Sequence, residues 1–534
     1  MHDTRLAVST GGMVTSPHAL ASEAGREVLR AGGNAIEAAI AIGAALCVTY
    51  PHFTGLGGDA FWVIADRHGT LRTLSGIGQA AAQLPAFDTT FGAAIAPRGA
   101  AAALTSAATV DTWSQAYEIG RTVWGGRQTW AALFARAIEY ASEGFPVTPS
   151  QHFWQNLRAN DLRALPGFAA TFAPHGRIPA VGERFTQPAL AGSLERLARF
   201  GAEEFYRGEL AERMARGLQQ AGSPLRLSDL ARTRARDEAP LRVAYRGGEL
   251  VSMRPPTQGV TTLQIMGILE RFALDSIAEG SADYYNLLVE AVKCAFMDRD
   301  RFVADPEFRH VPVDDMLCAA TLDAHARTIH PHDARPWPHT FQPGDTVFIG
   351  ATDREGRSVS VLQTVYFDWG SGVVAGDTGI LWHNRGASFS TDPAHHNAIQ
   401  PAKRPFHTLN PGMYLQNGQP RLLFGTQGAD GQPQTLAAIL TRLIDYRMDP
   451  LTALARPRFL LGKTFSDTRD ALKLEADAGA DVFAALAARG HEVREIPAQS
   501  PLAGHPGVIR LDANGTTCGA HDPRSDGRAL GVDV

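Results

Sequence analysis

The sequence GDTVFIGATDREGRSVSVLQTVYFDWGSG, residues 344–372, decides the fold of this chain. Two segments rich in β-branched residues flank the polar turn at residues 353–356, a pattern typical of a β-hairpin. If the hairpin is symmetric about Glu355, Thr364 lies directly opposite Thr346. Two threonine hydroxyls would then face each other across one ladder.

Thr346 stands where the first strand of this hairpin begins. A threonine hydroxyl is a poor nucleophile unless a base lies beside it, and cleavage of the chain between Asp345 and Thr346 would supply that base as a new α-amine. The pKa of an α-amine, about 7.7–8.0, leaves a useful neutral fraction at physiological pH. The alternative is that Thr346 is an ordinary β-former that opens a strand, because threonine is common in strands.

The segment before Thr346, residues 326–345, contains four prolines and three histidines. Such a segment neither packs a core nor sustains a helix, so we expect it to be mobile. An ordinary interdomain linker is one interpretation. Its position directly before Thr346 favours a processing segment.

Composition excludes several classes of function. The net charge of −5, without a long run of like charge, gives no footprint for nucleic acid, and no apolar segment is suited to span a membrane. The 18 histidines show no metal-ligand spacing, and the glycines of GLGG lack the Lys-Ser/Thr pair of a phosphate-binding loop, so we expect no metal and no cofactor. The four cysteines form no disulfide pattern, and MHDTRLAVSTGG is not a secretory signal, which favours the cytoplasm.

Hydrophobic periodicity predicts mostly helices before residue 345 and mostly strands after it. Helices are predicted for residues 19–31, from 35 onward, 110–119, 130–142, 190–200, 202–221, 283–298, 435–446 and 481–489. Strands are predicted for residues 60–65, 71–74, 242–251 as a pair, 379–382, 412–415 and 421–424. This order suits an α/β/β/α sandwich, an α+β fold of two mainly antiparallel sheets covered by helices.

Six segments resemble, in order, signatures of the gamma-glutamyltransferase family: GGMVTSPHALASEAGREVLRAGGNAIEAAIA, PHFTGLGGDAFWVI, GDTVFIGATDREGRSVSV, GSGVVAGDTGILWHNRGASFS, KRPFHTLNPGMYL and FGTQGADGQPQ. Members of that family are N-terminal nucleophile hydrolases that cleave themselves ahead of a threonine. The resemblance implies the same sandwich. It also implies a large fragment, residues 1–345, and a small fragment, residues 346–534, that carries the nucleophile and most of the core sheets.

The resemblance assigns four residues to the reaction. Thr346 corresponds to the nucleophile and Thr364 to the second threonine that hydrogen-bonds it. Gly428 and Ala429 correspond to two glycines whose backbone N–H groups form the oxyanion hole, and one such donor contributes about 10²–10³ in rate. Ala429 departs from the family's glycine. Its methyl group is tolerated there only if the φ angle of the residue is negative.

The substrate pocket departs further from a gamma-glutamyltransferase. The stretch LSGIGQAA lacks the arginine that holds the glutamyl carboxylate, and Ser388 replaces the acidic anchor of the α-amino group. Tyr366 replaces an asparagine, and His407 and Thr408 replace paired serines. Arg385 is new in this region, and its planar fork suits a small carboxylate. A salt bridge to a neighbouring acid is the alternative role of Arg385.

Loss of both charged anchors, at about 1.5–3 kcal/mol each, predicts glutamyl binding weakened by more than about a hundredfold. NRGASF, KRPFHTLNP and GADGQPQ are similar to a hydrolytic branch of the family that includes oxamate amidohydrolases and cephalosporin-acylase-like enzymes. The leading hypothesis is therefore a threonine amidase for a small carboxylate-bearing amide. A gamma-glutamyl hydrolase or transferase, a cephalosporin-acylase-like amidase and a silent scaffold remain as alternatives. The implied partners are that small substrate and the chain's own second fragment in a heterodimer, with a dimer of heterodimers left open.

Self-cleavage before Thr346 predicts two polypeptides. A denaturing gel or mass spectrum of purified protein is expected to show fragments of 345 residues and of the remaining 189 of the 534. Thr346→Ala is expected to leave one intact chain, because it removes the attacking hydroxyl. An intact chain in active wild-type material would contradict the hypothesis.

Overall fold

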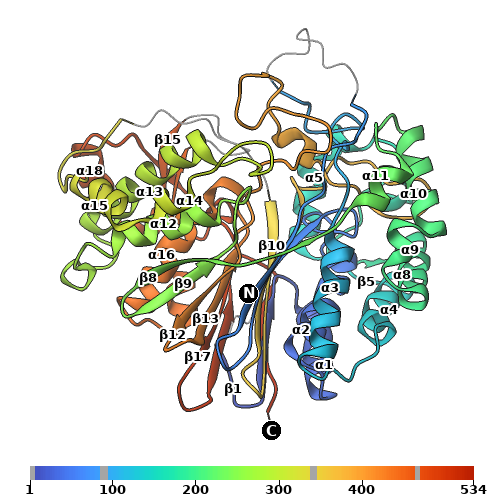
Figure 1. Cartoon of the computed structure of the whole chain (residues 1–534), viewed down its shortest axis with the longest axis horizontal. Coiled ribbons are helices and arrows are strands. Elements are labelled where there is room, and N and C mark those ends of the chain that lie inside the picture. Colours follow the sequence, from blue (N-terminus) through green and yellow to red (C-terminus); the bar gives the residue numbers. More distant parts are fainter. Residues whose placement is uncertain (1–5, 85–93, 337–344, 463–469, 534) are drawn as a thin grey trace.

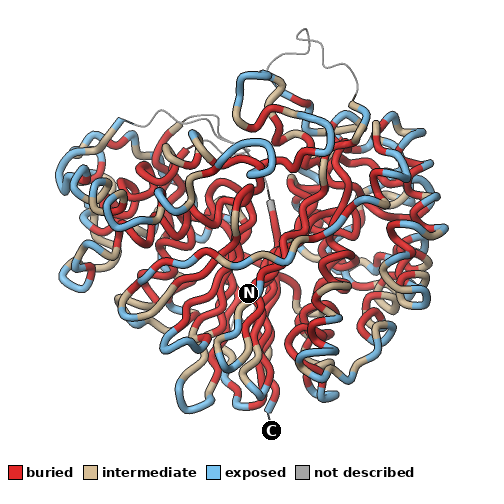
Figure 2. The backbone as a smooth tube through the Cα atoms, in the orientation of Figure 1, coloured by how far each residue is buried: buried red, intermediate tan, exposed pale blue. Residues whose placement is uncertain are grey.

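Two β-sheets lie face to face at the centre of the molecule, and helices cover both outer faces (Figure 1). The computed structural model describes residues 6–84, 94–336, 345–462 and 470–533. The α/β/β/α sandwich predicted from the sequence is therefore confirmed. Figure 2 shows that burial is greatest along the central strands and that the exposed segments lie at the outer helices and loops.

The first sheet contains the predicted hairpin at its centre. Its order is β19-β2-β10-β11-β3-β4-β7, and all of its pairs are antiparallel. The strands are β2 (Gly12–Ser16), β3 (Asp59–Ala65), β4 (Leu71–Gly76), β7 (Arg236–Glu238), β10 (Asp345–Asp353), β11 (Ser358–Tyr366) and β19 (Arg528–Gly531).

The second sheet packs against the first and has the order β1-β18-β17-β13-β12-β9-β8. Its strands are β1 (Ala7–Ser9), β8 (Leu241–Tyr245), β9 (Gly248–Ser252), β12 (Gly412–Gln416), β13 (Gln419–Thr426), β17 (Pro506–Leu511) and β18 (Thr517–His521). Two smaller sheets are formed by β14 (Phe459–Gly462), β15 (Ala471–Glu475) and β16 (Val493–Ile496), and by β5 (Phe145–Pro146) and β6 (Arg184–Phe185).

The helices form two outer layers (Figure 1). Against the first sheet lies a layer that includes α1 (Ala19–Arg30), α2 (Ala35–Thr49), α3 (Thr109–Thr122), α4 (Ala135–Glu143), α5 (Pro149–Leu157), α8 (Pro188–Phe200), α9 (Glu203–Tyr206), α10 (Glu209–Gln220) and α11 (Leu227–Arg232). Against the second lies a layer that includes α12 (Gly259–Leu269), α13 (Ala282–Phe302), α14 (Val313–Leu317), α15 (Ala319–Arg327), α16 (Gln432–Ile444) and α18 (Ala480–Ala488). No helix in the described part of the chain combines the length and apolar character that a membrane span requires.

An apolar layer joins the two sheets. Phe61, Leu362 and Phe348 from the first sheet pack with Leu423 and Ile509 from the second, and all five are buried. Alternate residues of each strand point into this layer, while the others point toward the helices, so both faces of the central strands are apolar. Burial of both faces explains why 358–366 is buried throughout instead of alternating.

The hairpin has the expected register, with one difference at the decisive residue. Pairs from Val347 with Gln363 onward are symmetric about Glu355. Between Asp345 and Val347, however, the register shifts. Thr346 lies at this irregularity, so it is not a regular cross-strand partner of Thr364 as predicted, although both residues lie at the same end of the hairpin. A bulge of this kind re-aims a side chain at a strand end.

Three further predictions differ from the structure. Residues 202–221 form two helices, α9 and α10, because Gly208 adopts an extended conformation between them. Residues 379–382 form isolated bridges and no strand. The segment expected to be mobile is fixed in its first part, since Lys293 Nζ of α13 donates to Arg335 O at 2.7 Å. Its remainder, residues 337–344, lies outside the described residues.

Both sheets mix strands from the two sides of the 345–346 bond. The C-terminal side supplies three strands to the first sheet and four to the second, so it contributes half of the fourteen strands and not most of them. β10 pairs with β11 from Asp345 onward and with β2 only from Gly350 to Asp353, so the end of β10 that carries Thr346 is paired with β11 alone.

Candidate functional site

Thr346 is the second residue of β10 and is fully buried. It lies at the end of the sheets where α16 begins. Its Oγ1 accepts a hydrogen bond from Nε2 of Gln432 at 3.3 Å. Gln432 is the first residue of α16 and is also fully buried. The structure therefore brings the N-terminus of α16 to the predicted nucleophile.

Thr364 lies at the far end of β11, next to a strained residue. Its Oγ1 accepts a hydrogen bond from the backbone N–H of Tyr366 at 2.7 Å. Tyr366 has a φ of +81°, a conformation that costs a bulky residue about 1–3 kcal/mol. A Cβ at Gly58 would overlap the carbonyl oxygen of Thr364, so the GLGG turn approaches this strand as the sequence indicated.

The predicted oxyanion turn has an unexpected backbone conformation. Gly428 has a φ of +129°, and Ala429 has a φ of +47°. The condition stated for tolerating a methyl group, a negative φ, is not met: the methyl group of Ala429 is held in the left-handed region, at a cost of about 1–2 kcal/mol. Successive N–H groups on such a turn make an anion-binding concavity. The strain therefore falls on the residues predicted to bind an oxyanion.

Gln258 ties this turn to the segment that contains Thr408. Its Nε2 donates to Ala429 O at 2.8 Å and to Thr408 O at 2.7 Å. Its Oε1 accepts from Arg299 at 3.0 Å, and Arg299 also lies 3.3 Å from Asp430. All these side chains are buried, so the turn is fixed from behind by a polar network.

Arg385 is a fully buried cation that the described protein leaves without a hydrogen bond. It lies in the short helix η4 (Arg385–Ser388), and none of its three guanidinium nitrogens has a hydrogen-bond partner among the described residues. Its Cζ lies 3.6 Å from the ring centroid of Tyr366, in cation–π geometry. Burial lowers the pKa of Arg385 to about 10, which keeps it charged at neutral pH. The direct salt bridge weighed as an alternative role is not formed within this part of the chain.

Asp59 is the nearby negative charge. Its Oδ2 lies 3.2 Å from Nε2 of His407 and 3.5 Å from Nδ1 of His383, all fully buried. Burial disfavours its charged form, but the two imidazoles and Arg385 together lower the pKa of Asp59. Burial, followed by the charge of Arg385, lowers the pKa of His407 to about 3. His407 is therefore neutral.

The other predicted pocket residues differ in whether their polar side-chain atoms are already hydrogen-bonded within the protein. His407 uses both ring nitrogens, since Nε2 faces Asp59 and Nδ1 accepts from the N–H of Leu409 at 3.3 Å. Ser388 donates to the carbonyls of Arg385 at 2.9 Å and Phe406 at 3.2 Å. Thr408 Oγ1 is buried, and the described residues offer it no partner. Arg385 and Thr408 thus remain for a ligand, while His407 and Ser388 hold the protein together.

Sequence reasoning did not single out Asp59, Gln258 or Gln432. Two of them stand inside motifs that were noted, Asp59 at the end of GLGGD and Gln432 in GADGQPQ, but one sequence does not reveal their roles. In the described ranges no group of three or more His, Cys, Asp or Glu side chains could hold a metal ion.

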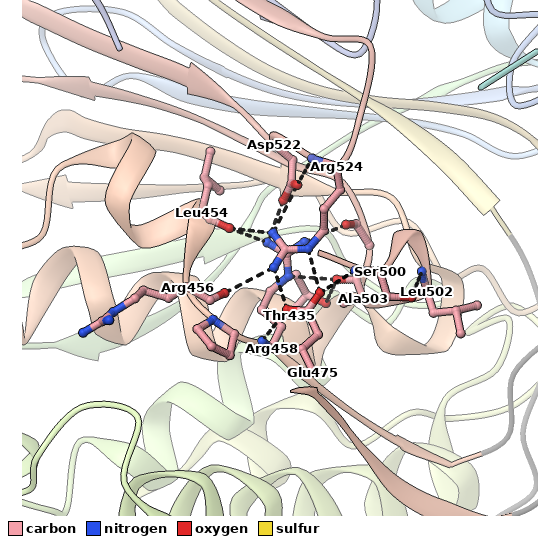
Figure 3. A network of polar contacts seen from close by, with 12 residues as sticks. Thr435, Leu454, Arg456, Arg458, Glu475, Ser500, Leu502, Ala503, Asp522 and Arg524 are labelled. Atoms are coloured by element: carbon pink, nitrogen blue, oxygen red, sulfur yellow. Dashed lines mark hydrogen bonds and ion pairs between the residues drawn. The ribbon is translucent and has the colours of Figure 1, made fainter. Parts of the chain in front are cut away.

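Two arginines and two carboxylates form a buried polar network (Figure 3). Arg458 lies 2.6 Å from Asp522, and Arg524 pairs with Glu475 at 2.5 Å. Their side chains are wholly inaccessible. Burial lowers the pKa of Arg458 to about 10, and the charge of Arg524 adds to this shift.

Arg458 also reaches the loop that backs the turn. It donates to Ala503 O at 3.0 Å and to Gly504 O at 2.8 Å. A Cβ at Gly428 would lie 3.5 Å from the Cα of Gly504. The network therefore positions the loop against which Gly428 packs.

Comparisons with known proteins show what the whole chain is similar to. The model of the gamma-glutamyltranspeptidase family matches residues 21–532. An oxamate amidohydrolase proenzyme of Klebsiella pneumoniae is 43% identical over 99% of this chain and 100% of its own length. A glutathione hydrolase-like YwrD proenzyme of Bacillus subtilis is 38% identical over 98% of this chain and 99% of its own. A cephalosporin acylase from Bacillus halodurans superposes with a TM-score of 0.91, at 32% identity, covering 100% of this chain and 98% of the acylase.

Ala429→Gly is expected to stabilise the protein. Removing the methyl group relieves left-handed strain of about 1–2 kcal/mol, while the freer unfolded chain of a glycine offsets about 0.4–1 kcal/mol. Denaturant unfolding should show a net gain of up to about 1.5 kcal/mol. Ala437→Gly inside α16 is the control and should lose about 1 kcal/mol or more. Equal losses of unfolding free energy in both variants would contradict the strain assigned to Ala429.

Arg458→Met is expected to destabilise the protein by about 3–5 kcal/mol, because it leaves the buried carboxylate of Asp522 undercompensated. The free energy of unfolding is best measured in the Thr346→Ala background, where a single chain unfolds. Arg456→Met is the matched control. Its guanidinium is half exposed in an ion pair with Glu279, so it should lose no more than about 1 kcal/mol. Similar losses in the two variants would overturn the role given to the network.

Proposed function

This chain belongs to the gamma-glutamyltranspeptidase family, and we propose that it is a self-processing threonine amidohydrolase for a small amide that carries a carboxylate, as oxamate does. That the chain is a hydrolase follows from its relatives, which are hydrolases and acylases across nearly its whole length. The choice of substrate rests on one observation: the buried guanidinium of Arg385 has no hydrogen-bond partner in the described protein.

A buried charge without hydrogen bonds is strongly unfavourable, so Arg385 is suited to receive an anion. A carboxylate matches its planar fork with two parallel hydrogen bonds. Thr408 Oγ1 offers one further polar group for the same small ligand. Because Thr346, Tyr366 and Arg385 are all almost inaccessible, a compact substrate fits this site better than an extended one.

The proposed reaction uses the residues at the end of the hairpin. Cleavage after Asp345 gives Thr346 a free α-amine, which takes the hydroxyl proton as Oγ1 attacks the amide carbon. The N–H groups of Gly428 and Ala429 hold the resulting oxyanion. The C–N bond then breaks, the proton passes to the leaving nitrogen, and ammonia departs. Water repeats the sequence on the acyl ester and releases the dicarboxylate.

A gamma-glutamyl substrate is less well supported by the charges of the site. Such a substrate needs an anion for its α-ammonium group as well as a cation for its carboxylate. The two carboxylates of the site, Asp59 and Asp430, already lie against His407 and Arg299. The relative named an oxamate amidohydrolase is also more similar to this chain than the glutathione hydrolase proenzyme of Escherichia coli, at 43% against 30% identity. We further propose that the two fragments stay together as a heterodimer and act in the cytoplasm.

Arg385→Met tests this proposal with a pair of substrates. For wild-type protein, kcat/KM should be much higher for oxamate than for oxamide, which has the same shape without the carboxylate. Arg385→Met should lower kcat/KM for oxamate by more than about a hundredfold, at 1.5–3 kcal/mol for each charged hydrogen bond. The value for oxamide should change little.

Two results would contradict the proposal. One is ammonia release from gamma-glutamyl amides far faster than from oxamate. The other is an equal loss of both activities in Arg385→Met at unchanged melting temperature, which would give Arg385 a structural role.

A further inference from the structure

Gln432 contacts Thr346 with one end of its side-chain amide, and the other end has no hydrogen-bond partner among the described residues. Nε2 donates to Thr346 Oγ1 at 3.3 Å. Oε1 is buried, and the described residues give it no hydrogen-bond partner. A buried acceptor left unpaired is costly, so a donor is expected at this place in the working enzyme.

A second glutamine in the same helical turn has hydrogen-bond partners at both ends of its side-chain amide. Gln434 is equally buried, but its Nε2 donates to Leu461 O at 3.0 Å and its Oε1 accepts from Leu461 N at 2.7 Å. Both ends are used to hold β14 against α16. The open acceptor of Gln432 is therefore not a general property of glutamines in this helix.

The described chain is continuous from Asp345 to Thr346, so the α-amine that processing creates does not yet exist in it. That amine belongs to the residue that Gln432 already contacts, and it carries N–H donors. We propose that Gln432 is a further catalytic residue: Nε2 holds Thr346 Oγ1 while Oε1 accepts an N–H from the new α-amine. This inference rests on the proposed function of Thr346.

The arrangement is chemically consistent because each group donates once around a closed ring. Gln432 Nε2–H donates to Oγ1, the hydroxyl of Thr346 donates to its own amine, and the amine donates to Gln432 Oε1. Hydrogen bonds that run in one direction strengthen each other. The ring leaves the amine lone pair pointing at the hydroxyl, which is the orientation a general base requires. During attack the hydroxyl proton moves to the amine, and the hydrogen bond to Oε1 becomes charge-assisted.

The acceptor end should also raise the pKa of the amine, because it binds the ammonium form more strongly than the neutral form. The other charges that surround the site belong to Asp430 on η5 (Ala429–Gly431), Arg299 on α13, Arg385 on η4 and Asp59 on β3. Changes at position 432 leave all four in place. A shift in the titration of the amine is then attributable to Gln432.

The pH dependence of kcat/KM for oxamate tests the inference in material that mass spectrometry shows to be split. Activity requires the neutral amine, so it is lost as the pH falls through the pKa of the amine. Gln432→Glu is isosteric and adds a negative charge, which should raise that pKa and move the acid limb up by about one unit. Gln432→Met removes the acceptor and should move the acid limb to lower pH. It should also reduce kcat about tenfold, because the amine lone pair is no longer oriented toward the hydroxyl of Thr346. Gln434→Met is the matched control and should lower the melting temperature while leaving the acid limb where it is in wild-type protein.

Coincident acid limbs in wild-type, Gln432→Glu and Gln432→Met protein would overturn the inference. A folded Gln432→Met chain that fails to split would support contact with the hydroxyl, since the same Oγ1 attacks during self-cleavage. The proposed function fails separately, if Thr346→Ala still splits or retains activity.

Discussion

The structure depends on one strand, β10, that begins beside the proposed reacting residue and still lies in the middle of a sheet. β10 starts at the proposed cleavage position, pairs with β11 along its length and pairs with β2 from Gly350 to Asp353. Because strands from both sides of the 345–346 bond interleave in both sheets, cutting that bond separates no layer of the core. If the bond is cut as proposed, the ladder with β11 keeps the new chain terminus in the sheet, where an ordinary terminus would fray.

Strained backbone conformations, and polar groups without a hydrogen-bond partner in the described chain, lie at this same end of the sheets. Tyr366 and Ala429 have positive φ angles, and Arg385 is buried without a hydrogen bond in the described chain. Each feature is unfavourable for folding alone, and each is held by surrounding groups that do not react, such as Gln258 and the loop fixed by Arg458. Concentration of such costs at one place is typical of a site organised for a ligand.

The fold was largely predictable from residue patterns. The alternation and turn of 344–372 predicted the hairpin and its symmetry about Glu355, and period-3.6 segments predicted most of the helices, because backbone periodicity acts locally. The regular pairing of Thr346 with Thr364 was not correctly predicted. A local shift in strand register depends on the side chains that pack against the strand end. The spacing of residues in the sequence does not reveal those contacts. The even division of strands between the two sides of the cleavage position was hidden for the same reason, since it is set by pairing across hundreds of residues.

By itself the sequence determined the sandwich and the family, and it singled out Thr346, Arg385 and the 428–429 turn as candidate site residues, because these follow from local pattern and from motifs. Only the tertiary structure decided which polar groups already have hydrogen-bond partners within the protein. It showed Ser388 and His407 held by the protein, Arg385 and Gln432 Oε1 without hydrogen-bond partners among the described residues, and Ala429 with a positive φ. Burial and hydrogen bonding are sums over neighbours distant in the chain, and a linear sequence does not contain them.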